Sequence, residues 1–200
     1  MKKYLAEFLG TFVLALAVGL SLAGTFPIPT PVVAALTLMV CVYTLGAISG
    51  AHFNPAISIG LLAIRKINLR TAIEYVIAQF AGAGLAKFVT TVYIAMPAPE
   101  VRDTIPTFAA EALGTFWLAV GVCSVVLGKA PGPAAGLTIG GSLLMAITLA
   151  LPGSNGVLNP AVALGIGSLS VAYIVSPLVG AVAAMFAYSF IARDDEKTAP

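Results

Sequence analysis

The chain has 200 residues, of which 60% are hydrophobic and 9% are charged, and its formal net charge is +2. A water-soluble domain needs a polar exterior, so this composition excludes a soluble globule and indicates a protein embedded in lipid. The small net charge gives no support for nucleic-acid binding. His52 is the only histidine and both cysteines lie in apolar segments, so we expect neither a metal site nor a cofactor.

Six apolar segments are long enough to cross a bilayer, which takes about 20 residues. In chain order they are Tyr4–Ala23, Pro31–Ile48, Thr71–Ala95, Thr107–Leu127, Pro133–Leu151 and Val171–Ala192. Two further apolar pieces, Asn54–Ile64 and Asn159–Leu169, have about half that length and cannot span alone. The first segment has features of a secretory signal, but Glu7 within it and a near copy downstream favour a retained helix.

The basic residues predict the orientation in the membrane. If the N-terminus is cytoplasmic and the half-length pieces enter and leave on one side, eight cations face the cytoplasm and Arg102 lies outside. The eight are Lys2, Lys3, Arg65, Lys66, Arg70, Lys129, Arg193 and Lys197. This bias predicts a multi-pass protein with both termini in the cytoplasm. The short polar ends favour a prokaryotic cell (inner) membrane.

The chain contains an internal repeat. Tyr4–Gly19 reads YLAEFLGTFVLALAVG and Phe108–Cys123 reads FAAEALGTFWLAVGVC, so Glu7 matches Glu111. An Asn-Pro-Ala triplet follows each copy at nearly the same distance. A chance likeness of apolar helices would not repeat glutamate, glycine and threonine in register.

The repeated unit is a span, a second span, a half-length piece and a third span. The copies cover roughly residues 1–96 and 107–192 of a single domain. Three spans are an odd number, so the second copy enters the membrane from the opposite side. We therefore predict an all-α membrane protein with six transmembrane helices and two re-entrant half-helices in an inverted repeat.

Each triplet has the residue types of a helix start. Asparagine is a preferred N-cap, and proline is favoured at the first helical position. The triplets are Asn54, Pro55 and Ala56, and Asn159, Pro160 and Ala161. The inverted repeat brings the two half-helix N-termini together near the midplane, where their dipoles and amides suit a neutral solute and repel a cation. Irregular backbone at this depth is tolerated only where it is buried in protein or lines water, so two re-entrant half-helices predict a polar path.

Three polar side chains near these loops each allow two interpretations. Glu7 and Glu111 either touch water at an interface or face inward and accept hydrogen bonds from a re-entrant loop. His52 either lines the inner vestibule or only fastens its loop. No nucleophile–base pair or phosphate-binding loop is present, so we do not expect an enzyme.

These motifs resemble those of the aquaporins and aquaglyceroporins, the major intrinsic protein family. They are AEFLGTF in the first span, SGAHFNPA in the first loop, AEALGTF in the fourth span and NPA in the second loop. The resemblance implies six spans and two half-helices, a pore in each subunit and a homotetramer. It also implies passive transport of water, glycerol or other small neutral solutes.

The sequence departs from the family at the residue after the second triplet, where an arginine usually stands and this chain has Val162. The family's outer constriction then corresponds to Ala34, Ile147, Gly156 and Val162. These residues are small or aliphatic, which predicts a wide, apolar pore for water and solutes of glycerol or urea size. The alternatives are a strictly water-selective pore, a secondary active transporter that would need Glu7 or Glu111 for coupling, and a non-conducting protein.

Overall fold

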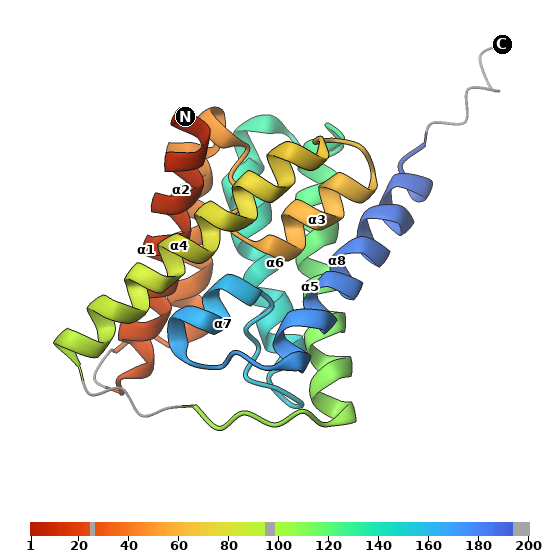
Figure 1. The fold of residues 1–200 in the computed structure, drawn as a ribbon. Helices are drawn as coiled ribbons and strands as arrows, with labels where there is room; N and C mark the ends of the chain where they lie inside the picture. Colours follow the sequence, from red (N-terminus) through yellow and green to blue (C-terminus); the bar gives the residue numbers. More distant parts are fainter. Residues whose placement is uncertain (25–26, 95–98, 194–200) are drawn as a thin grey trace, which may run out of the picture.

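The computed structural model describes residues 1–24, 27–94 and 99–193 (Figure 1). Every regular element in these ranges is helical: α1 (Lys2–Leu22), α2 (Thr30–Ser49), α3 (Pro55–Ala63), α4 (Leu69–Tyr93), α5 (Ile105–Val126), η1 (Gly132–Ala134, a 3₁₀ turn), α6 (Ala135–Ala150), α7 (Pro160–Ile166) and α8 (Val171–Ile191). Six of these are long and apolar enough to cross a membrane, which confirms the predicted all-α fold. Residues 95–96 of the first predicted repeat and Lys197 lie outside the described ranges.

The predicted spans agree with the observed helices to within two residues at the described ends. The second half-helix is the exception, because α7 ends at Ile166 and not at Leu169. Gly167 takes a left-handed conformation with φ +80°, and the Ser168 N–H donates to the Ala163 carbonyl, which closes the helix early. α7 therefore has seven residues and is roughly 10 Å long, which is well short of a span.

The helices are arranged as two matching halves. α1 packs on α4 as α5 packs on α8, and α2 and α6 pack on each other between the halves. The half-helices α3 and α7 lie inside the ring of long helices (Figure 1), and each packs on the last span of the other half, α3 on α8 and α7 on α4. The N-terminus and the end of α8 lie at the same end of the molecule.

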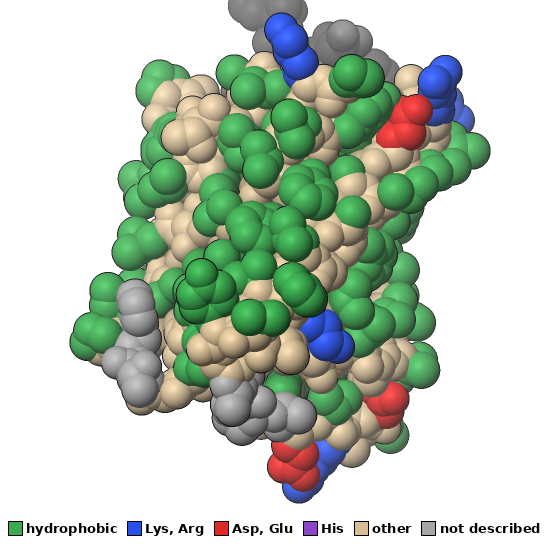
Figure 2. Space-filling model, turned by 60° about the vertical axis from the view of Figure 1, so that its left-hand side comes forward, with side chains coloured by type: hydrophobic (Ala, Val, Ile, Leu, Met, Phe, Trp, Pro, Cys, Tyr) green, Lys and Arg blue, Asp and Glu red, His purple; other side chains and the backbone are tan. Residues whose placement is uncertain are grey.

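The outer surface is apolar where a membrane would cover it. Along α1, large side chains such as Leu5 and Val13 are exposed, whereas small ones such as Ala6 and Ala15 are buried. Figure 2 shows hydrophobic side chains over most of the visible face and most charged side chains near its upper and lower edges. Small residues inside and large residues outside are typical of helices that pack closely in lipid.

Two matching glycines set the closest approach of the long helices. A Cβ on Gly82 of α4 would lie 2.3 Å from the Phe8 carbonyl oxygen of α1, and one on Gly180 of α8 would lie 2.2 Å from the Ala112 carbonyl oxygen of α5. Both contacts are with backbone, which cannot move aside without shifting a helix. Each glycine therefore sets the close approach of two long helices within its own half.

Gly82→Ala should destabilise the protein, because its methyl group overlaps the α1 backbone. Overpacking of this kind costs about 1–3 kcal/mol. Gly84→Ala is the matched control, since that glycine is in the same helix and a Cβ there meets nothing within 4 Å. Thermal unfolding in detergent measures both variants. Equal unfolding temperatures for the two alanine variants would contradict this assignment.

Candidate solute pathway

Both half-helices begin at their Asn-Pro-Ala triplets. The Asn54 side-chain oxygen accepts the Ala56 N–H at 2.9 Å, and the Asn159 oxygen accepts the N–H groups of Ala161 and Val162 at 3.0 and 3.3 Å. Each asparagine is thus an N-cap that satisfies N–H groups left open at a helix start.

The side-chain amides of the same asparagines join the two loops. Asn54 Nδ2 donates to the Leu158 carbonyl, and Asn159 Nδ2 donates to the Phe53 carbonyl, both at 2.9 Å. The sequence predicted these amides as donors to a solute but did not predict this reciprocal cross-link. Each amide carries two hydrogens, so one per asparagine is left for the cavity that both residues line.

The loops before the triplets have the same unusual backbone. Phe53 has φ 47° and Leu158 has φ 57°, and two residues earlier Ala51 and Gly156 also have positive φ. A bulky residue held in the left-handed region costs about 1–3 kcal/mol and needs support from its surroundings. Both loops therefore have the same left-handed backbone conformation, which brings their carbonyl groups towards the centre of the molecule.

Glu7 supplies that support in the first half. Its carboxylate accepts the N–H groups of His52 at 3.0 Å and Phe53 at 2.7 Å. The Ser49 hydroxyl and the Gln79 amide also donate to it, at 2.6 and 2.8 Å. The carboxylate is fully buried, as in the inward-facing interpretation.

Glu111 is the counterpart in the second half and is also fully buried. It accepts the N–H groups of Val157 and Leu158 at 3.0 and 2.7 Å and the Ser154 hydroxyl at 2.7 Å. No glutamine among the described residues donates to it, because the residue aligned with Gln79 is Pro177. The two carboxylates therefore have unequal sets of donors.

The glycines of the two repeated motifs make room for the loops. A Cβ on Gly10 would lie 2.2 Å from the Phe53 ring, and one on Gly114 would lie 2.6 Å from a Leu158 methyl group. Gly10 has its nearest contacts with a loop side chain, whereas Gly114 also lies close to Ala146 of α6.

His52 fits both of its interpretations. Its Nδ1 lies 2.9 Å from the Ser58 hydroxyl, which fastens the loop to α3, and its side chain lines the central cavity. The ring also meets the edge of Tyr75, with centroids 4.9 Å apart.

One cavity of about 380 Å³ brings the other predicted site residues together. Its lining includes both triplet asparagines and all four predicted constriction residues, Ala34, Ile147, Gly156 and Val162. Pro55, Ala56, Pro160 and Ala161 are buried in the helix starts and do not line the cavity.

The aliphatic lining extends well beyond the predicted constriction, and this extension was not predicted. Leu14 and Val18 of α1 and their repeat partners Leu118 and Val122 of α5 face the cavity, and so does Ile57, the repeat partner of Val162. Their spacing of four residues gave no distinguishing signal, because the exposed residues Leu5, Leu9 and Val13 of α1 have the same spacing. Within the described ranges, no lysine, arginine or acidic residue lines the cavity.

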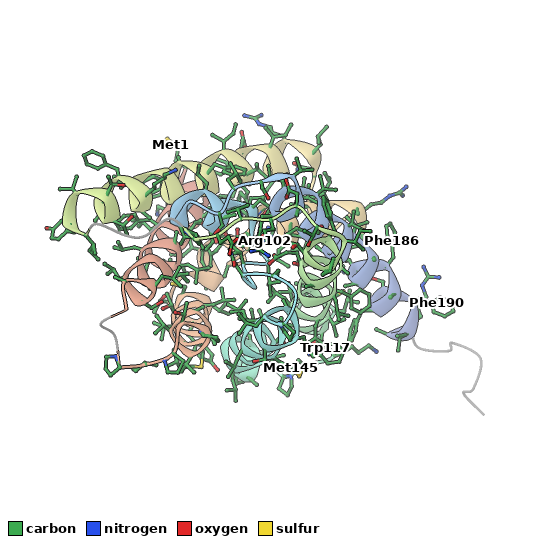
Figure 3. The ribbon with its side chains drawn as sticks, turned by 90° about the horizontal axis from the view of Figure 1, so that it is seen from below. Met1, Arg102, Trp117, Met145, Phe186 and Phe190 are labelled. Carbon is green, nitrogen blue, oxygen red and sulfur yellow. The ribbon has the colours of Figure 1, made fainter. Side chains whose placement is uncertain are left out.

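The segment before α5 lies over the end of the cavity opposite the N-terminus. The Glu100 carbonyl accepts the Asn155 amide at 3.0 Å, and Pro99 lines the cavity. Arg102 lies near the middle of this end in Figure 3, but its Nε pairs with the Glu100 carboxylate at 2.7 Å. The positive charge is thus balanced locally, and Arg102 does not replace the cation that is absent at Val162.

Asp103 fastens this segment to the start of α8. Its carboxylate accepts the Ser170 hydroxyl at 2.6 Å and the Ala172 N–H at 3.0 Å, so it caps a helix to which it does not belong. These bonds, led by that from Ser170, lower the pKa of Asp103 below its ordinary value. The stabilisation is therefore present above the ordinary pKa and is lost as the pH falls through the folded-state pKa.

Asp103→Asn should lower the unfolding temperature at neutral pH, because it removes the charge that accepts these bonds. The difference from wild type should shrink as the pH falls below about 4, where the wild-type carboxyl group also becomes neutral. Thermal unfolding across this pH range tests the prediction, with Glu100→Gln as a control on the same segment. A pH-independent difference would contradict it.

Comparisons with known proteins agree with this geometry. Residues 1–188 match the family model described as Major intrinsic protein. The chain is 33% identical to Aquaporin NIP1-1 of Zea mays, over 96% of this chain and 75% of that protein. It is 34% identical to Glycerol uptake facilitator protein-like 6 of Lactiplantibacillus plantarum, over 98% of this chain and 100% of that protein. Its fold is similar to the X-ray structure of the aquaglyceroporin from Plasmodium falciparum, with a TM-score of 0.78 over 94% of each chain at 24% identity.

Proposed function

Because this chain belongs to the major intrinsic protein family and is a passive channel for water and small solutes, we propose that its pore admits uncharged solutes of glycerol or urea size together with water. The protein is not an enzyme. The observation that carries the proposal is the aliphatic side chain of Val162, which lines the cavity with Ala34, Ile147 and Gly156. A guanidinium at this place would narrow the passage and offer hydrogen bonds. Without it the constriction is wider and less selective for water.

Exclusion of ions rests on two other features. Two half-helix N-termini meet at the asparagines, and each is equivalent to roughly half a positive charge. The aliphatic lining also offers no replacement for the water shell of an ion, whose removal is costly. We propose that Asn54 and Asn159 donate their remaining amide hydrogens to passing solutes, that Glu7 and Glu111 support the loops, and that His52 lines the inner vestibule.

The remaining assignments are proposals of the same kind. We propose a single channel domain with inverted repeats at about residues 1–96 and 107–192, which the matching loops and helix pairs support. Both termini are cytoplasmic in this proposal, because basic residues including Lys2, Lys3 and Arg193 mark the end that holds the N-terminus. We likewise propose a homotetramer, which the family resemblance supports, in the cell (inner) membrane.

Stopped-flow light scattering on reconstituted vesicles tests the proposed function. We expect faster shrinkage in an impermeant osmolyte, followed by faster re-swelling in glycerol and in urea than in protein-free vesicles. Solute entry should not depend on a proton or sodium gradient. Fast water flux without solute entry would instead identify a strictly water-selective pore, a gradient requirement would identify an active transporter, and no change would identify a non-conducting protein.

A further inference from the structure

A second hollow lies outside the pore, at the end that holds the N-terminus. It is an open groove of about 700 Å³ between the start of α1, the end of α3 and the start of α4. Its polar lining consists of Lys3, Arg65, Lys66, Asn68, Thr71 and Tyr75. We propose that this groove binds a phosphate-type anion, supplied either by an anionic phospholipid headgroup or by a free phosphate compound.

The charge of the groove is positive. Three cationic side chains line it and no acidic residue does so within the described ranges. Glu74, the acidic residue of α4, is held by the Arg70 Nε at 3.0 Å and by the Tyr4 hydroxyl. Arg65 and Lys66 make no salt bridge with any described residue, so their charges are available to a ligand.

The backbone places these cations together. Arg65 has φ 59°, and the turn is closed by the Arg65 and Lys66 N–H groups, which donate to the Leu62 and Leu61 carbonyls at 2.9 Å. A left-handed residue just after the last helical turn is a common way for a helix to end. The turn brings two consecutive cations to the groove beside the end of α3.

The opposite wall adds further donors. Lys3 Nζ donates to the Thr71 hydroxyl at 3.3 Å and lies 5.8 Å from the centre of the Tyr75 ring. Asn68 caps the Thr71 N–H at the start of α4 and also lines the groove, so its side-chain amide adds a donor. Lysine, arginine and amide N–H groups all donate to phosphate oxygens.

The orientation of the protein in the membrane does not by itself explain why these cations line one groove. The positive-inside bias requires cations on this face but no particular grouping among them. Lys2 and Arg193 are exposed cations at the same end and do not line the groove. They serve as a matched control because their replacement removes the same charge from the same face.

The groove shares a wall with the pore. Tyr75 lines the groove, its ring meets His52 of the pore lining, and its hydroxyl donates to the Ser49 carbonyl at 2.6 Å. Ser49 in turn donates to Glu7. An anion in the groove would therefore stabilise the end of the molecule on which the first re-entrant loop rests.

Native mass spectrometry and thermal unfolding of the purified protein in a neutral detergent test the proposal. The probes are phosphatidylglycerol against phosphatidylcholine, and inorganic phosphate against chloride at equal ionic strength. We expect Arg65→Gln with Lys66→Gln to weaken phosphatidylglycerol binding at least about tenfold. Lys2→Gln with Arg193→Gln should change it less than about twofold.

The lipid and inorganic phosphate measurements distinguish the two possible sources of the anion. Binding of phosphatidylglycerol without protection by inorganic phosphate identifies a lipid headgroup, and protection by inorganic phosphate identifies a soluble ligand. Equal weakening by both double variants, or none by either, would overturn the proposal because the effect would then be general surface charge or absent. Lys3→Gln is a second variant that leaves the Arg65 turn unchanged. The number of lipid adducts in the native mass spectrum reports binding independently of the stability of the protein. A lack of anion binding would not affect the proposed function of the pore, because the vesicle flux measurements test that function separately.

Discussion

Val162→Arg should reduce glycerol flux by about tenfold, equivalent to an added barrier of about 1.4 kcal/mol, and should reduce water flux much less. The Val162 N–H is fixed by Asn159, so a longer side chain at this position extends into the cavity and not into the protein. There it approaches Ala34, Ile147 and Gly156, which offer no side-chain partner for the guanidinium. Water is small enough to pass and to bond the new donors, whereas glycerol must fit beside them.

Val162→Met is the matched variant, because it adds length without charge or donors. We expect it to narrow the pore moderately, with a smaller difference between glycerol and water than the arginine variant shows. Light scattering on vesicles with equal amounts of reconstituted protein measures both solutes. If the arginine variant changed glycerol and water flux equally, or changed neither, Val162 would have no part in selectivity.

Glu111→Gln should be the most destabilising neutral replacement of a carboxylate among the described residues. Leu158 has a strained backbone that depends on a bond of its N–H to Glu111, and an amide in that place offers one oxygen where two accepted bonds. Each buried N–H left without an acceptor costs about 1–3 kcal/mol. The loss also frees the loop that carries Asn159, so the flux per folded channel should fall as well.

Glu7→Gln should be milder, because its half of the protein contains a second amide. The Gln79 side-chain oxygen has no partner among the described residues, so a rotated Gln79 amide can accept a hydrogen from the new glutamine. The rotation gives up the bond from Gln79 Nε2 to the Ser58 hydroxyl, and one backbone N–H of the loop stays unpaired, as in Glu111→Gln. Pro177, which takes the place of Gln79 in the second half, has no side-chain amide that could pair with a glutamine at position 111. Gln79→Leu in the Glu7→Gln background should remove this compensation and bring the loss close to that of Glu111→Gln. Equal unfolding temperatures for Glu7→Gln and Glu111→Gln would contradict this asymmetry.

Some parts of the site were predictable because their signals are local. An Asn-Pro pair favours a helix start wherever it occurs, and Asn54 and Asn159 cap α3 and α7 as such pairs should. The inward-facing glutamates were predictable in outline from their repeated position. The aliphatic lining was not, because Leu14 and Val18 do not differ in type from the lipid-facing leucines and valines around them.

The amino-acid sequence was enough to predict that the protein lies in lipid, that six segments span and two do not, and that the halves are inverted. These follow from composition, segment length and an odd number of spans per repeat, none of which depends on how helices pack. The tertiary structure alone decided that Asn54 and Asn159 tie the loops to each other, that Gln79 assists only one glutamate, and that Ala34, Ile147, Gly156 and Val162 share a cavity. The difference lies in separation along the chain. Helix propensity and apolar length act over a few residues, whereas hydrogen bonds and close packing at glycines join segments about a hundred residues apart.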